Sequence, residues 1–156
     1  MLYFVQGDMF LGNHEVLVNP INARGVAGKG VALQFKNNYP DWFTKYKEVC
    51  DKNALMAGDI WVYHTGLKYP KYIFNAVTKQ HWKYRSEKIW IIHCYQKIAN
   101  LILKFQVKSI GIPPLGCGCG GLYWGDIKPN VEHILGFNTD CNIYHYLPIK
   151  ENFTCL

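Results

Sequence analysis

The sequence predicts an α/β layered fold with a largely parallel sheet. Short apolar or alternating segments, typical of strands, take turns along the chain with longer segments whose apolar residues recur at helical spacing. The 156 residues are enough for one domain with one hydrophobic core, and 49% hydrophobic with 18% charged residues is an ordinary globular composition. We therefore expect a single domain over residues 1–156.

The amino-terminal third contains two predicted strands and a helical segment. LYFVQGD (2–8) and EVLVNPIN (15–22) have the apolar character of strands, and the second is expected to end at Pro20. The glycine-rich stretch ARGVAGKGVALQFK (23–36) leads into a helical pattern that extends to about residue 50. Pro40 must break or bend this pattern, because proline clashes with the preceding turn of a helix.

The middle of the chain continues the alternation. GDIWVYHTG (58–66) and KYIFNAV (71–77) are predicted strands. Ser86 is a candidate cap for a long helix, since serine hydroxyls accept the unpaired N–H groups of a first turn. The apolar face of this helix follows a 4-3-4-3 spacing: Ile91, Tyr95, Ile98, Ile102 and Phe105.

The carboxyl-terminal third adds two strands and a shorter helix. VKSIGIPPLG (107–116) is a strand that runs into a cluster of glycines, and NIYHYLPI (142–149) is the last strand. Between them, residues 123–136 have helical spacing, with Pro129 tolerated early in the helix. The residues expected to face inward are Val131, Ile134 and Leu135.

Charge and cysteine usage limit the class of partner. Lysine and arginine (17) outnumber acids (11), which gives a net charge of +6 and favours anionic partners. No basic segment precedes an apolar one at the start, so we expect a soluble, cytoplasmic protein without a membrane partner. The six cysteines are then expected to be reduced thiols. Because they form no C-x-x-C pair, and Cys117-x-Cys119 has no histidine at ligand spacing, no metal site is expected.

Three separate segments are expected to meet at one edge of the sheet. Ligands of parallel α/β sheets bind outside the carboxyl ends of the strands. This rule brings together NPIN (19–22), AVTKQHW (76–82) and PPLGCGCGG (113–121).

Two of the loops at this edge are rich in glycine. GVAGKGVA (25–32) is not a P-loop, because Gly30 follows Lys29 where serine or threonine should hold magnesium. Residues 116–121 match G-x-G-x-x-G, but the acid that would bind a ribose of a dinucleotide is misplaced. Backbone N–H groups of such loops bind phosphate oxygens. The two loops therefore indicate a diphosphate held from both sides, with two unrelated turns as the alternative.

Several long motifs resemble the macrodomain family, whose fold binds ADP-ribose. They are QGDMF (6–10), VLVNPINARGVAGKGVALQFKNNYP (16–40), TKQHW (78–82) and IPPLGCGCGGLYW (112–124), and the similarity extends from residue 3 to about 149. The details are most similar to the macrodomain of DarG antitoxins, which remove ADP-ribose from DNA bases modified by the toxin DarT. The resemblance implies a three-layer α/β fold, with helices on both faces of a mixed, mostly parallel sheet.

The resemblance also implies which residues contact the ligand. Asp8 would hold the adenine amino group, Asn22 would lie near the distal ribose, and the two glycine loops would enclose the diphosphate. The full implied set is Asp8, Met9, Asn22, Gly28, Lys29, Gly30, Val31, Pro114, Leu115, Gly116, Cys117, Gly118, Cys119, Gly120 and Trp124. A second interpretation of Asn22 stays open, in which it is a turn residue that caps the next segment.

Lys79 is the implied catalytic residue, with Asn22 beside it. From its residue type alone, a lysine after a strand is a solvated loop residue, but the essential lysine of DarG-like macrodomains matches this T-K position. A neutral amine can attack C1 of the opened distal ribose and form a Schiff base. Neutrality requires a lowered pKa, which nearby cations promote; His81, Lys83 and Arg85 are close in sequence. Related enzymes that act on protein-linked ADP-ribose have an aspartate at the place of Gly120, so glycine there favours the DNA substrate.

The segment around Lys79 has features of a nucleic-acid surface. Residues 68–88 contain six basic residues and one acid, with aromatic residues interleaved. Basic groups bind phosphates and rings stack on bases of single strands, although a solvated rim with ordinary strand aromatics has the same composition. The residues proposed to contact DNA are Arg24, His81, Trp82, Lys83 and Arg85.

The sequence thus predicts a metal-independent ADP-ribosyl glycohydrolase that acts on ADP-ribosylated, single-stranded DNA. ADP-ribose would be ligand or product rather than a cofactor, and a DNA-modifying toxin is a candidate partner. One alternative is hydrolysis of protein-linked ADP-ribose, O-acetyl-ADP-ribose or ADP-ribose 1''-phosphate. Another is a reader that binds ADP-ribose without cleaving it.

Overall fold

The computed structural model describes residues 1–138 and 140–149. Strands and helices alternate as predicted. In chain order they are β1 (Leu2–Val5), the 3-10 turn η1 (Met9–Leu11), β2 (Val16–Asn22), α1 (Gly30–Asn38), α2 (Pro40–Asp51), β3 (Ile60–His64), β4 (Tyr72–Lys79), α3 (Lys88–Lys104), β5 (Ser109–Ile112), α4 (Trp124–Leu135) and β6 (Asn142–Tyr146).

The strands form one mixed, mostly parallel sheet in the order β1-β6-β5-β2-β4-β3. Every neighbouring pair is parallel except β3 and β4, which are antiparallel. β2 and β4 lie inside the sheet and are buried along nearly their whole length, which explains their continuous apolar runs. The predicted fold class is therefore confirmed.

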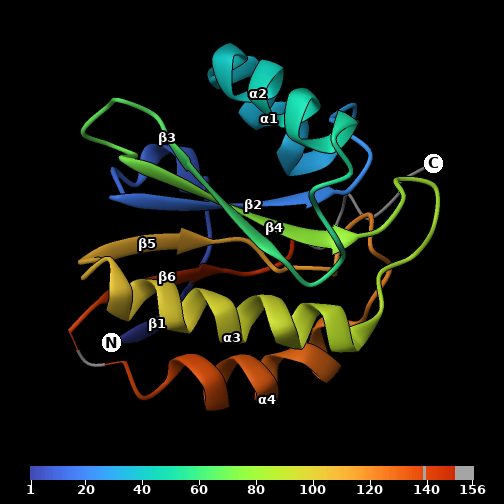
Figure 1. The fold of residues 1–156 in the computed structure, drawn as a ribbon. Coiled ribbons are helices and arrows are strands. Elements are labelled where there is room, and N and C mark those ends of the chain that lie inside the picture. The colour runs from blue at the N-terminus through green and yellow to red at the C-terminus, as the bar shows by residue number, and fades with distance from the viewer. Residues whose placement is uncertain (139, 150–156) are drawn as a thin grey trace.

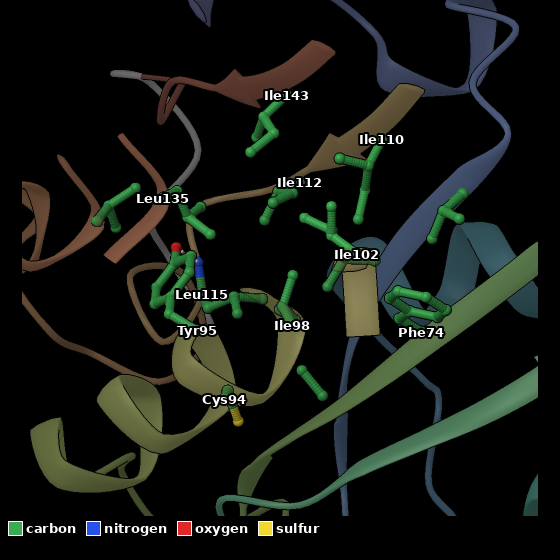
Figure 2. Close-up of a cluster of buried hydrophobic side chains, with 14 of the residues drawn as sticks. Phe74, Cys94, Tyr95, Ile98, Ile102, Ile110, Ile112, Leu115, Leu135 and Ile143 are labelled. Atoms are coloured by element: carbon green, nitrogen blue, oxygen red, sulfur yellow. Dashed lines mark hydrogen bonds between the residues drawn. The ribbon is translucent and has the colours of Figure 1, made fainter. Parts of the chain in front are cut away.

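Helices cover both faces of the sheet and make three layers (Figure 1). α3 and α4 pack on one face, where Ile91, Ile98 and Val131 meet strand residues such as Phe74 and Ile110. Figure 2 shows this core, with Tyr95 and Leu115 among its buried side chains. α1 and α2 pack on the other face, over β2 and β4. The sheet therefore lies between two helical layers.

The predicted helices are largely as expected. α3 buries Ile91, Tyr95, Ile98 and Ile102, the predicted face, and ends one residue before Phe105, which packs against the core. Pro40 divides the first helical pattern into α1 and α2 and occupies the first turn of α2, where its missing N–H costs no hydrogen bond. α4 tolerates Pro129 inside the helix.

The predicted end of the second strand is wrong. β2 does not end at Pro20 but continues to Asn22. The strand on that side, β5, pairs with β2 only at Val16 and Leu17, so the missing N–H of Pro20 breaks no sheet hydrogen bond there.

Ser86 is not the cap of α3. The residue before the helix is Glu87, in an extended conformation and without a side-chain cap. The N–H of Ser86 instead donates to the carbonyl oxygen of Gly120 at 2.9 Å. Its hydroxyl is buried and has no hydrogen-bond partner among residues 1–138 and 140–149. Tertiary packing against the loop after β5 has taken precedence over the local capping preference.

Cysteine chemistry differs from the prediction at one position. The buried free thiols are Cys50, Cys94, Cys117 and Cys141, and burial raises the pKa of each to about 11 or 12. Cys119 is disulfide-bonded, so the expectation of six reduced thiols is wrong there. That expectation came from the compartment, which carries no information on the sulfur atoms that a fold brings together. Cys155 lies outside the described residues.

Candidate active site

The carboxyl ends of β2, β4 and β5 meet at one edge of the sheet, as predicted. Asn22 at the end of β2 pairs with Lys79 at the end of β4. The first glycine loop (residues 23–31) and the second glycine loop (residues 113–121) approach each other, since a Cβ atom built on Gly30 would lie 3.7 Å from the Sγ atom of Cys119. Two glycine-rich loops and a lysine thus share one edge of the sheet.

Asn22 shapes the first glycine loop with both ends of its side-chain amide. Its Oδ1 accepts the N–H of Arg24 at 2.9 Å, and its Nδ2 donates to the carbonyl oxygen of Val26 at 2.7 Å. The buried hydroxyl of Tyr46 in α2 donates to the Asn22 carbonyl oxygen at 2.6 Å and lies 3.1 Å from Oδ1. The interpretation of Asn22 as a turn-forming residue is therefore confirmed, and contact with a ribose stays a prediction.

The first glycine loop ends in the amino terminus of α1. Gly28, Lys29 and Gly30 are exposed, and Gly30 adopts a positive φ of +60°. Lys29 precedes the helix without a side-chain cap. The N–H groups of a first helical turn have no partner within the helix and attract anions, so this end of α1 fits the predicted diphosphate.

The second glycine loop needs glycine for space and, at Gly116 and Gly121, for a positive φ of +74° and +76°. A Cβ atom on Gly116 would lie 2.7 Å from the Ile91 side chain, and one on Gly120 would lie 2.4 Å from the Ser86 hydroxyl oxygen and 2.5 Å from the Gly116 carbonyl oxygen. Gly118, in contrast, is exposed and has nothing within 4 Å of its Cβ position. The loop is thus pressed against α3 on one side and open at Gly118 on the other.

Leu115 and Cys117 point into the protein. Both side chains are buried. The N–H of Leu115 donates to the Tyr95 hydroxyl at 3.3 Å, and that of Cys117 donates to the Pro114 carbonyl oxygen at 3.2 Å. A ligand contact by these two residues would therefore use other atoms than their N–H groups.

A buried hydrogen-bond chain connects the second glycine loop to α3 and β6. His145 is fully buried, and its Nδ1 lies 3.1 Å from the Tyr146 carbonyl oxygen. A carbonyl only accepts, so Nδ1 carries the proton and Nε2 accepts from the Tyr95 hydroxyl at 2.8 Å. That hydroxyl in turn accepts the N–H of Leu115. The start of the loop is therefore anchored in the core.

We expect the hydrogen bonds of His145 to make the stability of the folded protein depend on pH, with a loss in acid. Burial lowers the pKa of His145 from 6.5 to about 3. Between these two pH values the imidazole is therefore protonated in the unfolded state and neutral in the folded state. The contribution of His145 to the free energy of unfolding is fully present above about pH 6.5 and is lost as the pH falls toward 3, by about 2 kcal/mol at about pH 5. Urea unfolding at several pH values measures this loss. In His145→Gln the loss over this window should shrink; an unchanged loss would assign it to other groups.

Trp124 packs inward rather than standing free at the rim. It begins α4, and its ring stacks on His145 with centroids 4.7 Å apart and meets Phe4 edge-on at 6.2 Å. It therefore packs against the buried histidine whose hydrogen-bond chain anchors Leu115. Contact between Trp124 and a ligand stays a prediction.

Asp8 lies past the carboxyl end of β1 at the same edge. It is exposed, and its Oδ1 accepts the N–H of Phe10 at 2.9 Å. Met9 is buried in the core. Tyr146, at the end of the neighbouring strand β6, has a pKa raised by burial and by the charge of Asp8. The carboxylate and the phenol are thus neighbours at the predicted adenine end.

Lys79 is half-buried at the end of β4. Its Nζ atom donates to the carbonyl oxygen of Trp82 at 3.1 Å. Its pKa is lowered from the usual lysine value, first by burial and second by the positive charge of Lys29. The cation that acts on Lys79 therefore comes from the opposite loop, whereas the sequence suggested His81, Lys83 and Arg85.

The segment after Lys79 carries exposed aromatic and basic side chains. The His81 ring lies 5.4 Å from Trp82 and 5.3 Å from Tyr84 between centroids, and both Trp82 and Tyr84 are more than half exposed. Arg85 has a structural contact, since its guanidinium donates a hydrogen bond to the Gly121 carbonyl oxygen. Arg24 and Lys83 are exposed. Rings and cations therefore lie beside Lys79, and Arg85 ties them to the second glycine loop.

Within 1–138 and 140–149, no group of three or more histidine, cysteine or acidic side chains is arranged to hold a metal ion. In the same ranges no helix is both long and apolar enough to cross a membrane.

Comparison with known proteins establishes the family. A family model for the Macro domain matches residues 18–129. The chain belongs to the macrodomain family. The DNA ADP-ribosyl glycohydrolase of Thermus aquaticus is 38% identical to this macrodomain over 152 residues, which make up 97% of this chain and 42% of that protein. Its counterpart in Mycobacterium tuberculosis is 40% identical over 129 residues, 82% of this chain and 37% of that protein. The macrodomain thus spans well under half the length of these relatives.

Solved structures agree with this assignment. The macrodomain of Thermus aquaticus DarG superposes with a TM-score of 0.89 at 39% identity, and covers 95% of this chain and 99% of that one. The macrodomain of Mycobacterium tuberculosis DarG gives 0.91 at 36% identity, with 96% and 99% covered. Thermosipho africanus DarTG in complex with ADP-ribose gives 0.88 at 30% identity, with 98% and 43% covered.

Sequence reasoning missed the residues that hold the site from behind. Tyr95 was assigned to a helix face, and Tyr46 lay unremarked within a predicted helix. The Tyr46 hydroxyl bonds Asn22, which leads into the first glycine loop, and the Tyr95 hydroxyl bonds Leu115 in the second. Two tyrosines at core positions were a usable signal, because a buried hydroxyl needs a partner. His145 gave no signal, since a lone histidine in a strand is compatible with many environments.

Proposed function

We propose that this macrodomain, spanning residues 1–156, binds ADP-ribose and hydrolyses the N-glycosidic link between ADP-ribose and a DNA base. The observation that carries the proposal is Lys79, a half-buried lysine with a lowered pKa at the edge of the sheet where two glycine loops face each other. Relatives that match most of this chain are DNA ADP-ribosyl glycohydrolases, and one related structure contains ADP-ribose.

In the proposed reaction, the neutral amine of Lys79 attacks C1 of the opened distal ribose. The new C1–Nζ bond replaces the bond from C1 to the base nitrogen, and the base leaves with a proton. Water then adds to the resulting C1=N bond and releases ADP-ribose, which returns Lys79 to its amine form. The sum of the steps is hydrolysis, with one water consumed and no metal required.

The DNA strand is proposed to lie over the aromatic and basic segment after Lys79. The rings of His81 and Trp82 would stack on flanking bases, and Arg24 and Lys83 would contact phosphates. Arg85, which bonds Gly121, would contribute charge from a fixed position. Exposure of Trp82 and Tyr84 supports a single-stranded substrate, since only unpaired bases offer their faces to such rings.

The proposed setting is the cytoplasm, where the enzyme would reverse the action of a DNA-modifying toxin. Support comes from a Thermosipho africanus relative, 30% identical over 166 residues, that is a fusion of a DNA ADP-ribosyl transferase with a DNA ADP-ribosyl glycohydrolase. In such a pair, one activity supplies the substrate of the other.

Substrate comparison tests the proposed function. An ADP-ribosylated single-stranded oligonucleotide, an ADP-ribosylated protein and ADP-ribose 1''-phosphate are incubated in parallel with the protein. We expect the oligonucleotide to regain the gel mobility of unmodified DNA, at a higher rate than either other substrate is cleaved. Faster cleavage of one of those would reassign the substrate, and binding of ADP-ribose without any cleavage would make the protein a reader.

Removal of the charge on Lys29 should shift the pH dependence of turnover. Because the neutral amine of Lys79 reacts, kcat rises as the pH passes its pKa, and Lys29 lowers that pKa. In Lys29→Gln the rising limb should move to higher pH. Turnover of the oligonucleotide at saturating concentration measures it, with Lys36→Gln in α1 as control, whose amine lies over the Phe43 ring. An unmoved limb in Lys29→Gln would exclude this coupling.

A further inference from the structure

We infer that Thr78 and Gln80, the neighbours of Lys79 in the chain, are positioning residues that fix the catalytic lysine between β2 and the segment before β3. The inference rests on the function proposed above, because it concerns the placement of the amine that reacts. Its basis is a β-bulge and two side-chain hydrogen bonds, one on each side of Lys79.

The bulge lies at the end of the β2–β4 pair. The two strands keep one register up to Ile21, which is opposite Val77, and then Asn22 is opposite Lys79. Thr78 is therefore the extra residue. Since side chains alternate between the faces of a sheet, one extra residue changes where all later side chains point. Bulges of this kind re-aim side chains next to active sites, and here the side chain re-aimed is that of Lys79.

Thr78 closes the bulge on the side of β2. Its side chain is buried, with 6% exposed, and its Oγ1 donates to the Ile21 carbonyl oxygen at 3.3 Å. Ile21 is the residue at which the register changes. Beyond the extra residue, the N–H of Ala23 donates to the Lys79 carbonyl oxygen at 3.0 Å. The backbone of Lys79 is thus tied to β2 directly and through the hydroxyl of its neighbour.

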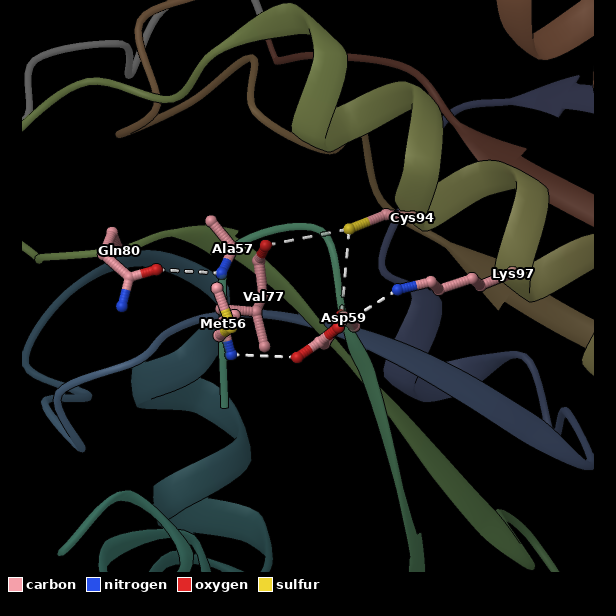
Figure 3. Close-up of polar contacts among 7 residues, drawn as sticks. All are labelled: Met56, Ala57, Asp59, Val77, Gln80, Cys94 and Lys97. Atoms are coloured by element: carbon pink, nitrogen blue, oxygen red, sulfur yellow. Dashed lines mark hydrogen bonds and ion pairs between the residues drawn. The ribbon is translucent and has the colours of Figure 1, made fainter. Parts of the chain in front are cut away.

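Gln80 holds the opposite side, toward the segment before β3. Its Oε1 accepts the N–H of Ala57 at 3.0 Å, as Figure 3 shows. The following residues of that segment pair with β4: the N–H of Gly58 donates to the Val77 carbonyl oxygen at 2.8 Å, and the N–H of Val77 donates to Asp59 at 2.9 Å. The segment is itself anchored, because Asp59 forms an ion pair with Lys97 of α3 at 3.0 Å.

These contacts connect the backbone around Lys79 to β2 in the sheet and, through the segment before β3, to α3. A lysine side chain is long and flexible, so its attacking position depends on where its backbone is held and on the bond from Nζ to the Trp82 carbonyl oxygen. A displacement of about 1 Å from the productive geometry costs about 10²-fold in rate. Loss of either side-chain bond should therefore reduce catalysis more than ligand binding.

The test compares Thr78→Val, which keeps the shape but not the hydroxyl, with Thr78→Ser, which keeps the hydroxyl. Gln80→Met removes the acceptor on the other side. We measure kcat on the ADP-ribosylated oligonucleotide, Kd for ADP-ribose and the thermal unfolding midpoint. For Thr78→Val and Gln80→Met we expect kcat to fall about tenfold or more with a nearly unchanged Kd, and Thr78→Ser to recover most of the rate. Unchanged kcat in both variants, or equal losses in rate and affinity, would overturn the inference.

A second readout keeps this inference separate from the proposed function. After reductive ¹³C-methylation, the methyl signal of Lys79, assigned by its absence in Lys79→Arg, reports its titration by NMR. We expect Thr78→Val to raise the Lys79 pKa toward the usual lysine value, because a displaced side chain is less buried. If the wild-type protein cleaves no ADP-ribosylated DNA, the proposed function is wrong, and this titration alone decides whether Thr78 positions Lys79. An unshifted pKa would then refute the positioning role.

Discussion

Lys79→Ala should lose turnover of ADP-ribosylated DNA and keep its affinity for ADP-ribose. Removal of the attacking amine eliminates the covalent step, so we expect kcat to fall by about 10³-fold or more. The ligand loops lie on other elements, since the glycine loops follow β2 and β5. Single-turnover gel assays measure the rate, and titration calorimetry measures the affinity.

Lys79→Arg is the matched variant for this prediction. Arginine keeps a positive charge of similar reach but stays protonated at every working pH, so it cannot supply a neutral nucleophile. We expect it to be as inactive as Lys79→Ala. If Lys79→Arg retained a tenth or more of the wild-type rate, the lysine would act through its charge, and the proposed covalent step would be wrong.

Gly120→Ala should disrupt the second glycine loop and weaken ADP-ribose binding by about tenfold or more. The added methyl group would lie 2.4 Å from the Ser86 hydroxyl and 2.5 Å from the Gly116 carbonyl oxygen, distances that force the loop to change shape and to move away from Ser86. Overpacking of this kind costs about 1–3 kcal/mol of stability. Urea unfolding and ADP-ribose calorimetry measure the two effects.

Two further variants make the Gly120 prediction specific. Gly118→Ala adds the same methyl group where nothing lies within 4 Å, so its unfolding free energy should change by less than about 0.5 kcal/mol. Ser86→Ala combined with Gly120→Ala removes one contact but leaves the backbone contact with Gly116, so it should not restore the loop. Wild-type stability and binding in Gly120→Ala itself would show that the loop tolerates a side chain there.

The same contacts give a physical account of glycine at position 120. Macrodomains that act on protein-linked ADP-ribose are expected to have an aspartate at this place, and in this chain its Cβ atom would overlap the Ser86 hydroxyl. Ser86 lies next to Arg85, which bonds Gly121. The loop after β4 and the second glycine loop therefore contact each other through Ser86 with Gly120 and Arg85 with Gly121. A larger residue at position 120 would require a change at position 86.

The fold was predictable because its signals are local and repeated. β2 and β4 are apolar runs that remain buried inside the sheet, and α3 buries the 4-3-4-3 face read from the sequence. The two errors have a common cause. Pro20 stays within a strand because of where β5 ends, and Ser86 gives up its capping role to contact Gly120. Both outcomes depend on which distant segment lies alongside, and a local pattern does not contain that information.

The candidate site was predictable in its location but not in its electrostatics. Strand order and glycine content brought Asn22, Lys79 and the two glycine loops to one edge of the sheet. The cation beside Lys79 was sought nearby in sequence and is Lys29, from across the site. The bulge at Thr78 was likewise invisible, because a register shift is a property of two strands. Sequence patterns thus locate the reacting groups, whereas their neighbours come from tertiary structure.

The covalent role of Lys79 is the central claim, and trapping the intermediate tests it most directly. The wild-type protein is mixed with ADP-ribosylated single-stranded DNA and borohydride, which reduces a Schiff base to a stable amine, and the peptides are analysed by mass spectrometry. We predict that ADP-ribose becomes attached to Lys79, and that unmodified DNA is released in equal amount. Release of DNA under the same conditions without an adduct, or with the adduct on another residue, would contradict the account.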